Sequence, residues 1–228
     1  FLGITTMINW MMAVEGFDDY DLSSLRNFQY GGGPMPRSVV EAALKAFPCT
    51  MIQGYGQTEG MTMTFLSQED HQRAVAGDHP ERLGSCGREG FVSEIRVVDP
   101  EGEPVPRDGQ TAGEIVVRSE ANMLGYWRRP DLTEQTLRSG WMWTGDIATW
   151  DAEGYVFIVD RAKDMIISGG ENIYSTQVEA AIHQHPAVLE SAVFGIPDDT
   201  WGEAVKAVVV LKPGQTATEE EIIAEASK

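Results

Sequence analysis

The sequence predicts an α/β domain that carries a small β-barrel subdomain and is followed by an incomplete α+β domain. Three observations lead to this prediction. A strand–helix–strand pattern occupies the first part of the chain, short strands separated by Gly, Pro and Asp turns follow, and strands alternate with helices again near the end. We expect these three parts to span residues 1–83, 84–160 and 161–228.

The first part has the pattern of parallel strand pairing. A strand over residues 25–30 precedes an amphipathic helix over 37–47, and a second strand covers 50–56 and runs into a glycine turn. Strand, helix and strand in this order favour two parallel neighbours in one sheet. A buried helix is expected before them, where apolar residues recur at helical spacing: Ile4, Ile8, Met11 and Met12.

The second part is typical of a small barrel or sheet. The stretch EIRVVDPEGEPVP contains a strand and then a turn at residues 99–102, and AGEIVVRS is another strand. Two further strands are joined across residues 151–154. Short strands at regular spacing with turn residues between them are the signature of this architecture.

The third part begins with a strand that ends at a double glycine, residues 164–170. Two apolar strands, 187–196 and 203–212, follow the next helix, and a last helix begins where the sequence stops. Each helix start has a Thr with a Glu three residues later, the pattern of a capping box: Thr176 with Glu179, and Thr218 with Glu221. No low-complexity linker precedes this part, so we expect a sharp hinge near residues 160–163.

The net charge of −18 excludes some classes of partner. A phosphate backbone or an anionic lipid surface attracts a basic face, so nucleic acid is not an expected partner. No apolar run reaches the length of about 18 residues that predicts a transmembrane helix, and peripheral membrane contact stays open. Cys49 and Cys86 form no ligand or disulfide motif, which favours reduced thiols and a cytoplasmic location.

Four stretches could carry chemistry. YGGGPMP (30–36) and GYGQTEG (54–60) are glycine turns at strand ends, WTGD (143–146) places an acid after Thr-Gly at a strand end, and DRAKDMIISGGENIYS (160–175) joins a charged elbow to a double glycine. Glycine lets backbone approach a ligand closely, and a carboxylate beside a phosphate needs a cation between them. Each stretch alone is also explained as an ordinary turn, and GYGQTEG as a hairpin-like turn with a solvated acid.

Their order and joint occurrence resemble the adenylate-forming superfamily, which includes acyl-CoA synthetases, luciferases and adenylation domains. The string DRAKDMIISGGENIYSTQVEAAIHQHPAV resembles bacterial fatty-acyl-CoA and related acid–CoA ligases most. The resemblance implies that a carboxylic acid reacts with ATP and Mg²⁺ to give acyl-AMP and pyrophosphate. A thiol, here that of CoA, then attacks the acyl-AMP.

The resemblance also implies roles for five residues of the first part. Gly32 and Gly33 match backbone that passes the adenine edge and the acyl group. Tyr55 matches a residue that stacks on adenine, Thr58 matches an α-phosphate contact, and Glu59 matches the magnesium ligand. Thr58 and Glu59 are therefore the expected catalytic residues, with Glu59 the expected metal ligand.

Five further residues match positions near the predicted hinge. Asp146 matches the acceptor of the ribose hydroxyls, and Arg161 matches a ribose and phosphate contact. Lys163 matches the hinge about which the small domain rotates between the two half-reactions. Gly169 and Gly170 match a loop beside the tunnel of the pantetheine arm, where a side chain would obstruct the thiol.

The sequence departs from the family at both ends. The glycine-rich phosphate loop with its lysine and the adenylation lysine are absent, and Lys228 is in the wrong context for the latter role. We therefore expect an internal piece of an AMP-forming ligase for a fatty or similar hydrophobic acid, inactive by itself. Glu114 and Tyr126 are expected to be structural. A carrier-protein thiol or oxygen as acceptor, and a non-catalytic adenine-nucleotide-binding module, stay open, as do the acid, the oligomeric state and the true termini.

Overall fold

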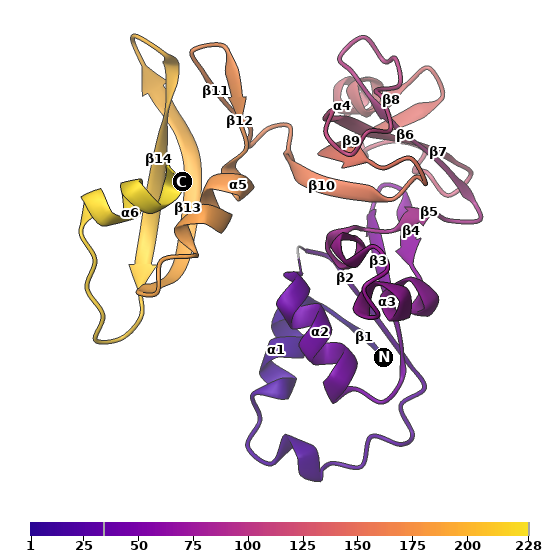
Figure 1. Cartoon of the computed structure of the whole chain (residues 1–228). Helices are drawn as coiled ribbons and strands as arrows, with labels where there is room; N and C mark the ends of the chain where they lie inside the picture. The colour runs from indigo at the N-terminus through magenta and orange to yellow at the C-terminus, as the bar shows by residue number, and fades with distance from the viewer. Residues whose placement is uncertain (34, 228) are drawn as a thin grey trace. The chain divides into compact units, whose positions relative to one another are not determined.

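A computed structural model describes residues 1–33 and 35–227. Contacts divide the chain into two compact units (Figure 1). The first consists of residues 1–144 and 148–158, and the second of residues 145–147 and the chain from Val159 onward. The predicted fold class is confirmed: a mixed α/β part, a half-barrel of strands and an α+β piece. The three proposed domain boundaries stay a prediction.

The first sheet has five strands in the order β1-β2-β3-β4-β5. Their bounds are β1 Leu2–Gly3, β2 Asn27–Gly31, β3 Thr50–Gln57, β4 Met61–Leu66 and β5 Arg88–Glu89. Strands β1, β2 and β3 are mutually parallel, and β4 and β5 continue the sheet in antiparallel pairing. The helices of this part are α1 Thr5–Met12, α2 Arg37–Ala46, α3 Gln68–Val75 and the 3-10 helices η1 Phe17–Asp19 and η2 Pro80–Gly84. The predicted parallel pairing across α2 is therefore confirmed.

Aromatic residues form much of the core beneath this sheet. Phe28 on β2 meets Phe47, which follows α2, edge to face with ring centroids 4.9 Å apart. Helix α1 is less buried than its apolar pattern predicts, because only Ile8 is fully covered and Trp10 is 70% exposed. The expectation of a buried helix was therefore wrong for its outer face, since apolar periodicity identifies one covered side and does not show what covers the other.

The half-barrel is the four-stranded sheet β10-β9-β7-β6, with the short strand β8 paired to β9. The bounds are β6 Ser93–Val98, β7 Gly113–Ser119, β8 Leu137–Arg138, β9 Trp141–Trp150 and β10 Val156–Arg161, with helix α4 Pro130–Thr136 before β8. Alternate residues of β6 and β7, such as Ile95, Val97 and Ile115, are buried in one apolar cluster. The predicted strands and their turns are confirmed in this region.

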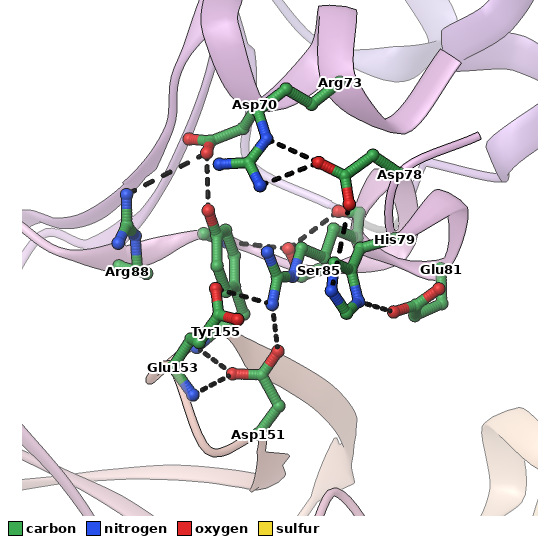
Figure 2. Close-up of polar contacts among 12 residues, drawn as sticks. Asp70, Arg73, Asp78, His79, Glu81, Ser85, Arg88, Asp151, Glu153 and Tyr155 are labelled. Atoms are coloured by element: carbon green, nitrogen blue, oxygen red, sulfur yellow. Dashed lines mark hydrogen bonds and ion pairs between the residues drawn. The ribbon is translucent and has the colours of Figure 1, made fainter. Parts of the chain in front are cut away.

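A polar cluster fastens the turn between β9 and β10 to α3 and η2 within the first unit (Figure 2). The Arg82 guanidinium is buried, forms ion pairs with Asp151 and Glu153, and lies 3.9 Å from the centre of the Tyr155 ring. The Tyr155 hydroxyl donates to Asp70. Burial and the Asp70 carboxylate raise the pKa of Tyr155 to about 12, so the phenol remains a donor at neutral pH.

The second unit contains the antiparallel sheet β12-β11-β14-β13. Its elements are β11 Ile166–Ser168, β12 Glu171–Ile173, α5 Ser175–Ile182, β13 Val188–Asp198, β14 Gly202–Leu211 and α6 Glu219–Ala226. Ile166, Ile182, Val188 and Val193 form its small core. Nowhere in the described ranges of the chain is a helix both long and apolar enough to cross a membrane.

The two predicted capping boxes have different outcomes. At α6 the box is present, with the Thr218 side chain accepting from the Glu221 N–H and the Glu221 side chain accepting from the Thr218 N–H. At α5 the prediction is wrong, because the N-cap is Tyr174 and no described side chain caps the helix. The Thr176 and Glu179 side chains bond to other segments instead, as described below.

Candidate functional site

The GYGQTEG stretch forms the end of β3, a tight turn and the start of β4. The turn closes with a hydrogen bond from the Gly60 N–H to the Gln57 carbonyl, 3.1 Å long. A Cβ on Gly56 would lie 1.9 Å from the Met61 carbonyl oxygen, so only glycine fits where the register of the hairpin shifts. Glu59 therefore stands at the tip of a tight hairpin, next to the exposed Thr58.

The triple glycine after β2 has two distinct structural reasons. A Cβ on Gly31 would lie 2.1 Å from the carbonyl oxygen of Gly54, its partner on β3, so this glycine permits the close approach of the two strands. Gly32 has a φ of +79°, a left-handed conformation that glycine adopts without strain. Within the described ranges no atom lies within 4 Å of a Cβ built on Gly33, so packing alone does not require glycine there. Pro34 of the same motif lies outside the described residues.

Tyr55 is part of the half-barrel core. Its side chain is 8% exposed and belongs to the apolar cluster that includes Met63 and Ile95. The structure gives this ring a packing role, and its stacking on adenine stays a prediction.

Glu59 does not have the environment of a solvated acid. The Tyr126 hydroxyl donates to Glu59 Oε1 at 2.8 Å, and the Met123 N–H donates to the Glu59 carbonyl at 2.6 Å. Both donors lie in the loop between β7 and α4, and the Glu59 residue is half-buried. Burial and the bond to Glu59 raise the pKa of Tyr126 above its ordinary value, which keeps the phenol protonated as a donor.

A buried histidine that the sequence reasoning missed holds the strand end before the triple glycine. The His71 Nδ1 atom lies 2.6 Å from the Ser67 carbonyl, which can only accept, so Nδ1 carries the proton. The Tyr30 hydroxyl therefore donates to Nε2 across 2.7 Å. Burial lowers the pKa of His71, so the neutral ring is the form that holds β2 against α3. The only sequence signal was a histidine in an otherwise helical segment.

Asp146 lies in the middle of β9, and the expectation of a strand end was wrong. Gly145 has a φ of +73°, and the strand continues through it to Trp150. The Asp146 carboxylate is buried, and the Arg161 Nε at the end of β10 lies 2.9 Å from its Oδ1. The structure thus brings together two of the predicted nucleotide contacts as an ion pair.

The predicted hinge residue lies two residues after the end of β10. Lys163 is exposed in a turn that closes with hydrogen bonds from the Asp164 and Met165 N–H groups to the Arg161 carbonyl, each 3.0 Å long. Asp160, three residues before Lys163, is buried, and its carboxylate accepts from Ser175 Oγ at 2.9 Å. These bonds join the chain on both sides of Lys163, which the sequence did not suggest.

Gly169 and Gly170 form the turn between β11 and β12, with φ values of +61° and +88°. A Cβ on Gly169 would lie 2.8 Å from the Trp201 ring, whereas a Cβ on Gly170 would meet no described atom within 4 Å. The two glycines therefore differ: protein packing excludes a side chain at Gly169, and only the backbone conformation disfavours one at Gly170.

The predicted site residues fall into both units. Gly32, Gly33, Tyr55, Thr58 and Glu59 belong to the first unit, and the others belong to the second: Asp146, Arg161, Lys163, Gly169 and Gly170. Their convergence around one nucleotide stays a prediction.

The donor set at Glu59 fits a nucleotide-bound magnesium ion. In residues 1–33 and 35–227, no three His, Cys, Asp or Glu side chains form a metal-binding group. Mg²⁺ bound to a nucleotide takes most of its ligands from phosphates and water and needs only one or two carboxylates. Glu59 supplies one carboxylate, and among the described residues its Oε2 has no hydrogen-bond partner.

Comparison with known families identifies the class. A family model described as "AMP-binding enzyme" matches residues 1–127, and one described as "AMP-binding enzyme C-terminal domain" matches residues 177–228. The chain belongs to the AMP-binding enzymes, the adenylate-forming superfamily.

Individual relatives refine this class. The chain is 42% identical over 222 residues to a feruloyl-CoA synthase of an Amycolatopsis species, an alignment that covers 97% of this chain and 43% of the relative. It is 42% identical over 193 residues to the medium/long-chain-fatty-acid–CoA ligase FadD8 of Mycobacterium tuberculosis, covering 84% of this chain and 32% of that protein. The structure of the amide bond synthetase McbA from Marinactinospora thermotolerans superposes with a TM-score of 0.84 at 36% identity, covering 98% of this chain and 44% of McbA. The chain thus spans less than half the length of these relatives.

Proposed function

We propose that these residues are part of an ATP-dependent, AMP-forming acid–CoA ligase. In this reaction a carboxylate attacks the α-phosphate of ATP, which yields acyl-AMP and releases pyrophosphate. The CoA thiol then attacks the acyl carbon, which yields the thioester and releases AMP. The observation that carries the proposal is the Glu59 carboxylate, held at the tip of a glycine hairpin beside the exposed Thr58 hydroxyl.

Glu59 and Thr58 would act on the phosphates. Glu59 Oε2 would hold the magnesium ion, which supplies charge neutralisation at the phosphates when it is bound. The Thr58 hydroxyl would donate to an α-phosphate oxygen. Gly32 and Gly33 would let the adenine edge and the acyl group pass the backbone, and Tyr55 would stack on the base.

The second unit would supply the ribose contacts and the hinge. The Asp146 carboxylate would accept from the ribose hydroxyls, and the Arg161 guanidinium beside it would contact ribose and phosphate. Lys163 would be the residue about which the small domain rotates before thiol transfer. The Gly169–Gly170 turn would then border the path of the pantetheine arm.

We propose a fatty or similar hydrophobic acid as substrate. Relatives at equal identity carry the names of feruloyl-CoA and fatty-acid–CoA enzymes, so similarity alone does not choose between an aromatic and an aliphatic acid. Hydrophobic pockets discriminate a single methylene by only about 1–3 kcal/mol, so selection by chain length should be gradual.

The test uses the full-length protein that contains these residues. Pyrophosphate release should require ATP, Mg²⁺ and an acid, and AMP should form in equal amount when CoA is also present. The acid series should include aliphatic chains of increasing length and cinnamic-type aromatic acids. Release of ADP and phosphate, or no nucleotide turnover with any acid, would contradict the proposed reaction.

A carrier-protein thiol is the second candidate acceptor. A Cβ on Gly170 would meet no described protein atom within 4 Å, which leaves room for the pantetheine arm of CoA. Gly170→Trp should therefore abolish thioester formation and preserve most acyl-AMP formation. Equal loss of both half-reactions would count against this role. The third candidate function is a non-catalytic nucleotide-binding protein. Such a protein would bind AMP and would not release pyrophosphate from ATP.

A further inference from the structure

The loop between β7 and α4, residues 120–129, is attached to the hairpin that carries Glu59. Met123 contributes its N–H to the Glu59 carbonyl, and Tyr126 contributes its hydroxyl to the Glu59 carboxylate. Gly60, the next residue of the hairpin, also packs closely against its neighbours. A Cβ there would lie 3.1 Å from Asn122 Oδ1 of the loop and 2.7 Å from the Met142 side chain. The loop therefore contacts both the backbone and the side chain of the hairpin tip.

Helix α4 fixes the backbone of Tyr126 through a hydrogen bond. The Thr133 hydroxyl accepts from the Tyr126 N–H at 2.9 Å and donates to the Arg129 carbonyl at 2.9 Å. A Cβ on Gly125 would approach the Thr133 side chain to 2.8 Å, which shows how closely the loop packs on the helix. The position of the phenol is thus determined by a helix and not by a free loop.

We infer that Tyr126 is a positioning residue for the Glu59 carboxylate, occupying Oε1 so that Oε2 is presented to the magnesium ion of the bound nucleotide. This inference rests on the proposed function of Glu59. A metal-ligating carboxylate that is not hydrogen-bonded can rotate about its last bond and exchange its two oxygens. The phenol removes this freedom, because only one oxygen can accept from it at 2.8 Å.

Phenylalanine at this position would keep the ring and the backbone bond to Thr133, and it would remove the interactions of the hydroxyl with the Glu59 carboxylate and with the Thr136 side chain.

The experiment is a Mn²⁺ titration of the full-length protein in the presence of ATP, with free Mn²⁺ measured by electron paramagnetic resonance. Removing an outer-shell partner of a metal ligand typically weakens metal binding 10- to 100-fold. We expect a loss in this range for Tyr126→Phe, with metal-free ATP binding changed less than about twofold. The matched control is Tyr20→Phe, which removes an exposed hydroxyl elsewhere in the first unit and should bind Mn²⁺ like the unmodified protein.

Glu59→Gln in the same titration separates the proposed metal role of Glu59 from the proposed positioning role of Tyr126. If Glu59→Gln weakens Mn²⁺ binding and Tyr126→Phe does not, the positioning role is wrong and Tyr126 only fastens the loop. If neither variant changes Mn²⁺ binding, the metal role proposed for Glu59 is wrong. Should Tyr126→Phe fail to fold, Thr133→Val decides instead, since it keeps the phenol and removes its backbone anchor. Weaker Mn²⁺ binding by Thr133→Val supports the inference, and unchanged binding overturns it.

Discussion

Helices α5 and α6 begin with the same Thr-x-x-Glu pattern and use it in opposite ways. At α6, Thr218 and Glu221 satisfy each other's backbone N–H groups. At α5, the Thr176 hydroxyl donates to the Val159 carbonyl, and Glu179 Oε1 accepts from the Val193 N–H at 2.9 Å. One pattern thus makes a local cap in the first case and two tertiary anchors in the second.

The difference follows from what surrounds each helix start. The first turn of α6 is exposed, so the nearest groups that need partners are those of its own backbone. The first turn of α5 lies against β10 and β13, where the carbonyl of the half-buried Val159 and the Val193 N–H are within reach. Backbone polar groups that are partly withdrawn from water are costly without partners, so the tertiary bonds form in preference to the cap.

The α5 anchors also bear on the proposed hinge. Ser175 bonds to Asp160 and Thr176 bonds to Val159, three and four residues before Lys163. A rotation that begins at Lys163 would leave these bonds intact only if residues 159–161 moved with α5.

The largest expected effect comes from the buried acid among these anchors. Asp160→Ala should lower the free energy of unfolding of the second unit by about 3 kcal/mol, because it leaves the Ser175 hydroxyl and the Arg161 N–H without their charged acceptor. Urea unfolding followed by amide exchange in α5 measures this. Asp164→Ala removes an exposed acid from the adjacent turn and is the control. Equal stability of the two variants would show that the anchor does not stabilise α5.

The Tyr30–His71 hydrogen bond is a further tertiary contact, and its strength should depend on pH because His71 can be protonated. The pKa of His71 in the folded protein is below the ordinary value of 6.5. As the pH falls below 6.5, the unfolded chain therefore binds more protons than the folded protein does. Stability should therefore be greatest above pH 6.5 and fall toward pH 5, by at most about 1.4 kcal/mol per pH unit. Thermal unfolding across this range measures the effect, and His71→Gln should lose this component. A pH dependence that His71→Gln leaves unchanged would assign it to other groups.

The two threonines give a matched pair with a smaller effect. Thr218→Ala should cost about 1 kcal/mol and increase amide exchange in the first turn of α6, because the cap is lost. Thr176→Ala should cost a similar amount and leave exchange in the first turn of α5 nearly unchanged, since its hydroxyl serves Val159. Faster exchange at the start of α5 in Thr176→Ala would mean that this threonine does cap its helix.

The two glutamates should show the smallest effect. Glu221→Gln keeps a capping acceptor and loses only the favourable interaction of a negative charge with the helix N-terminus, about 0.3–1 kcal/mol. Glu179→Gln keeps an acceptor for the Val193 N–H, and we expect a change below about 0.5 kcal/mol. Chemical denaturation of both variants tests this, and a larger loss in Glu179→Gln than in Glu221→Gln would indicate that the charge at α5 has a role of its own.

The sequence by itself determined the elements, their order and the class of protein. The alternating apolar residues of β6 and β7, the strand–helix–strand pattern around α2 and the cap at Thr218 all depend on neighbours within a few residues, so local patterns were enough. The family motifs were equally readable, because their residues are contiguous in the chain.

Only the tertiary structure decided how those residues are held. Each of these side chains has a partner that is distant in the sequence. The pairs are Asp146 with Arg161, Glu59 with Tyr126, Tyr30 with His71, and Asp160 with Ser175. In the last three pairs, which are side-chain hydrogen bonds, the partners are 15 to 67 residues apart. A side-chain hydrogen bond requires two groups within about 3 Å, and the path of the chain sets that distance, not the spacing in the sequence. The same physical reason explains why one Thr-x-x-Glu became a cap and the other became an anchor.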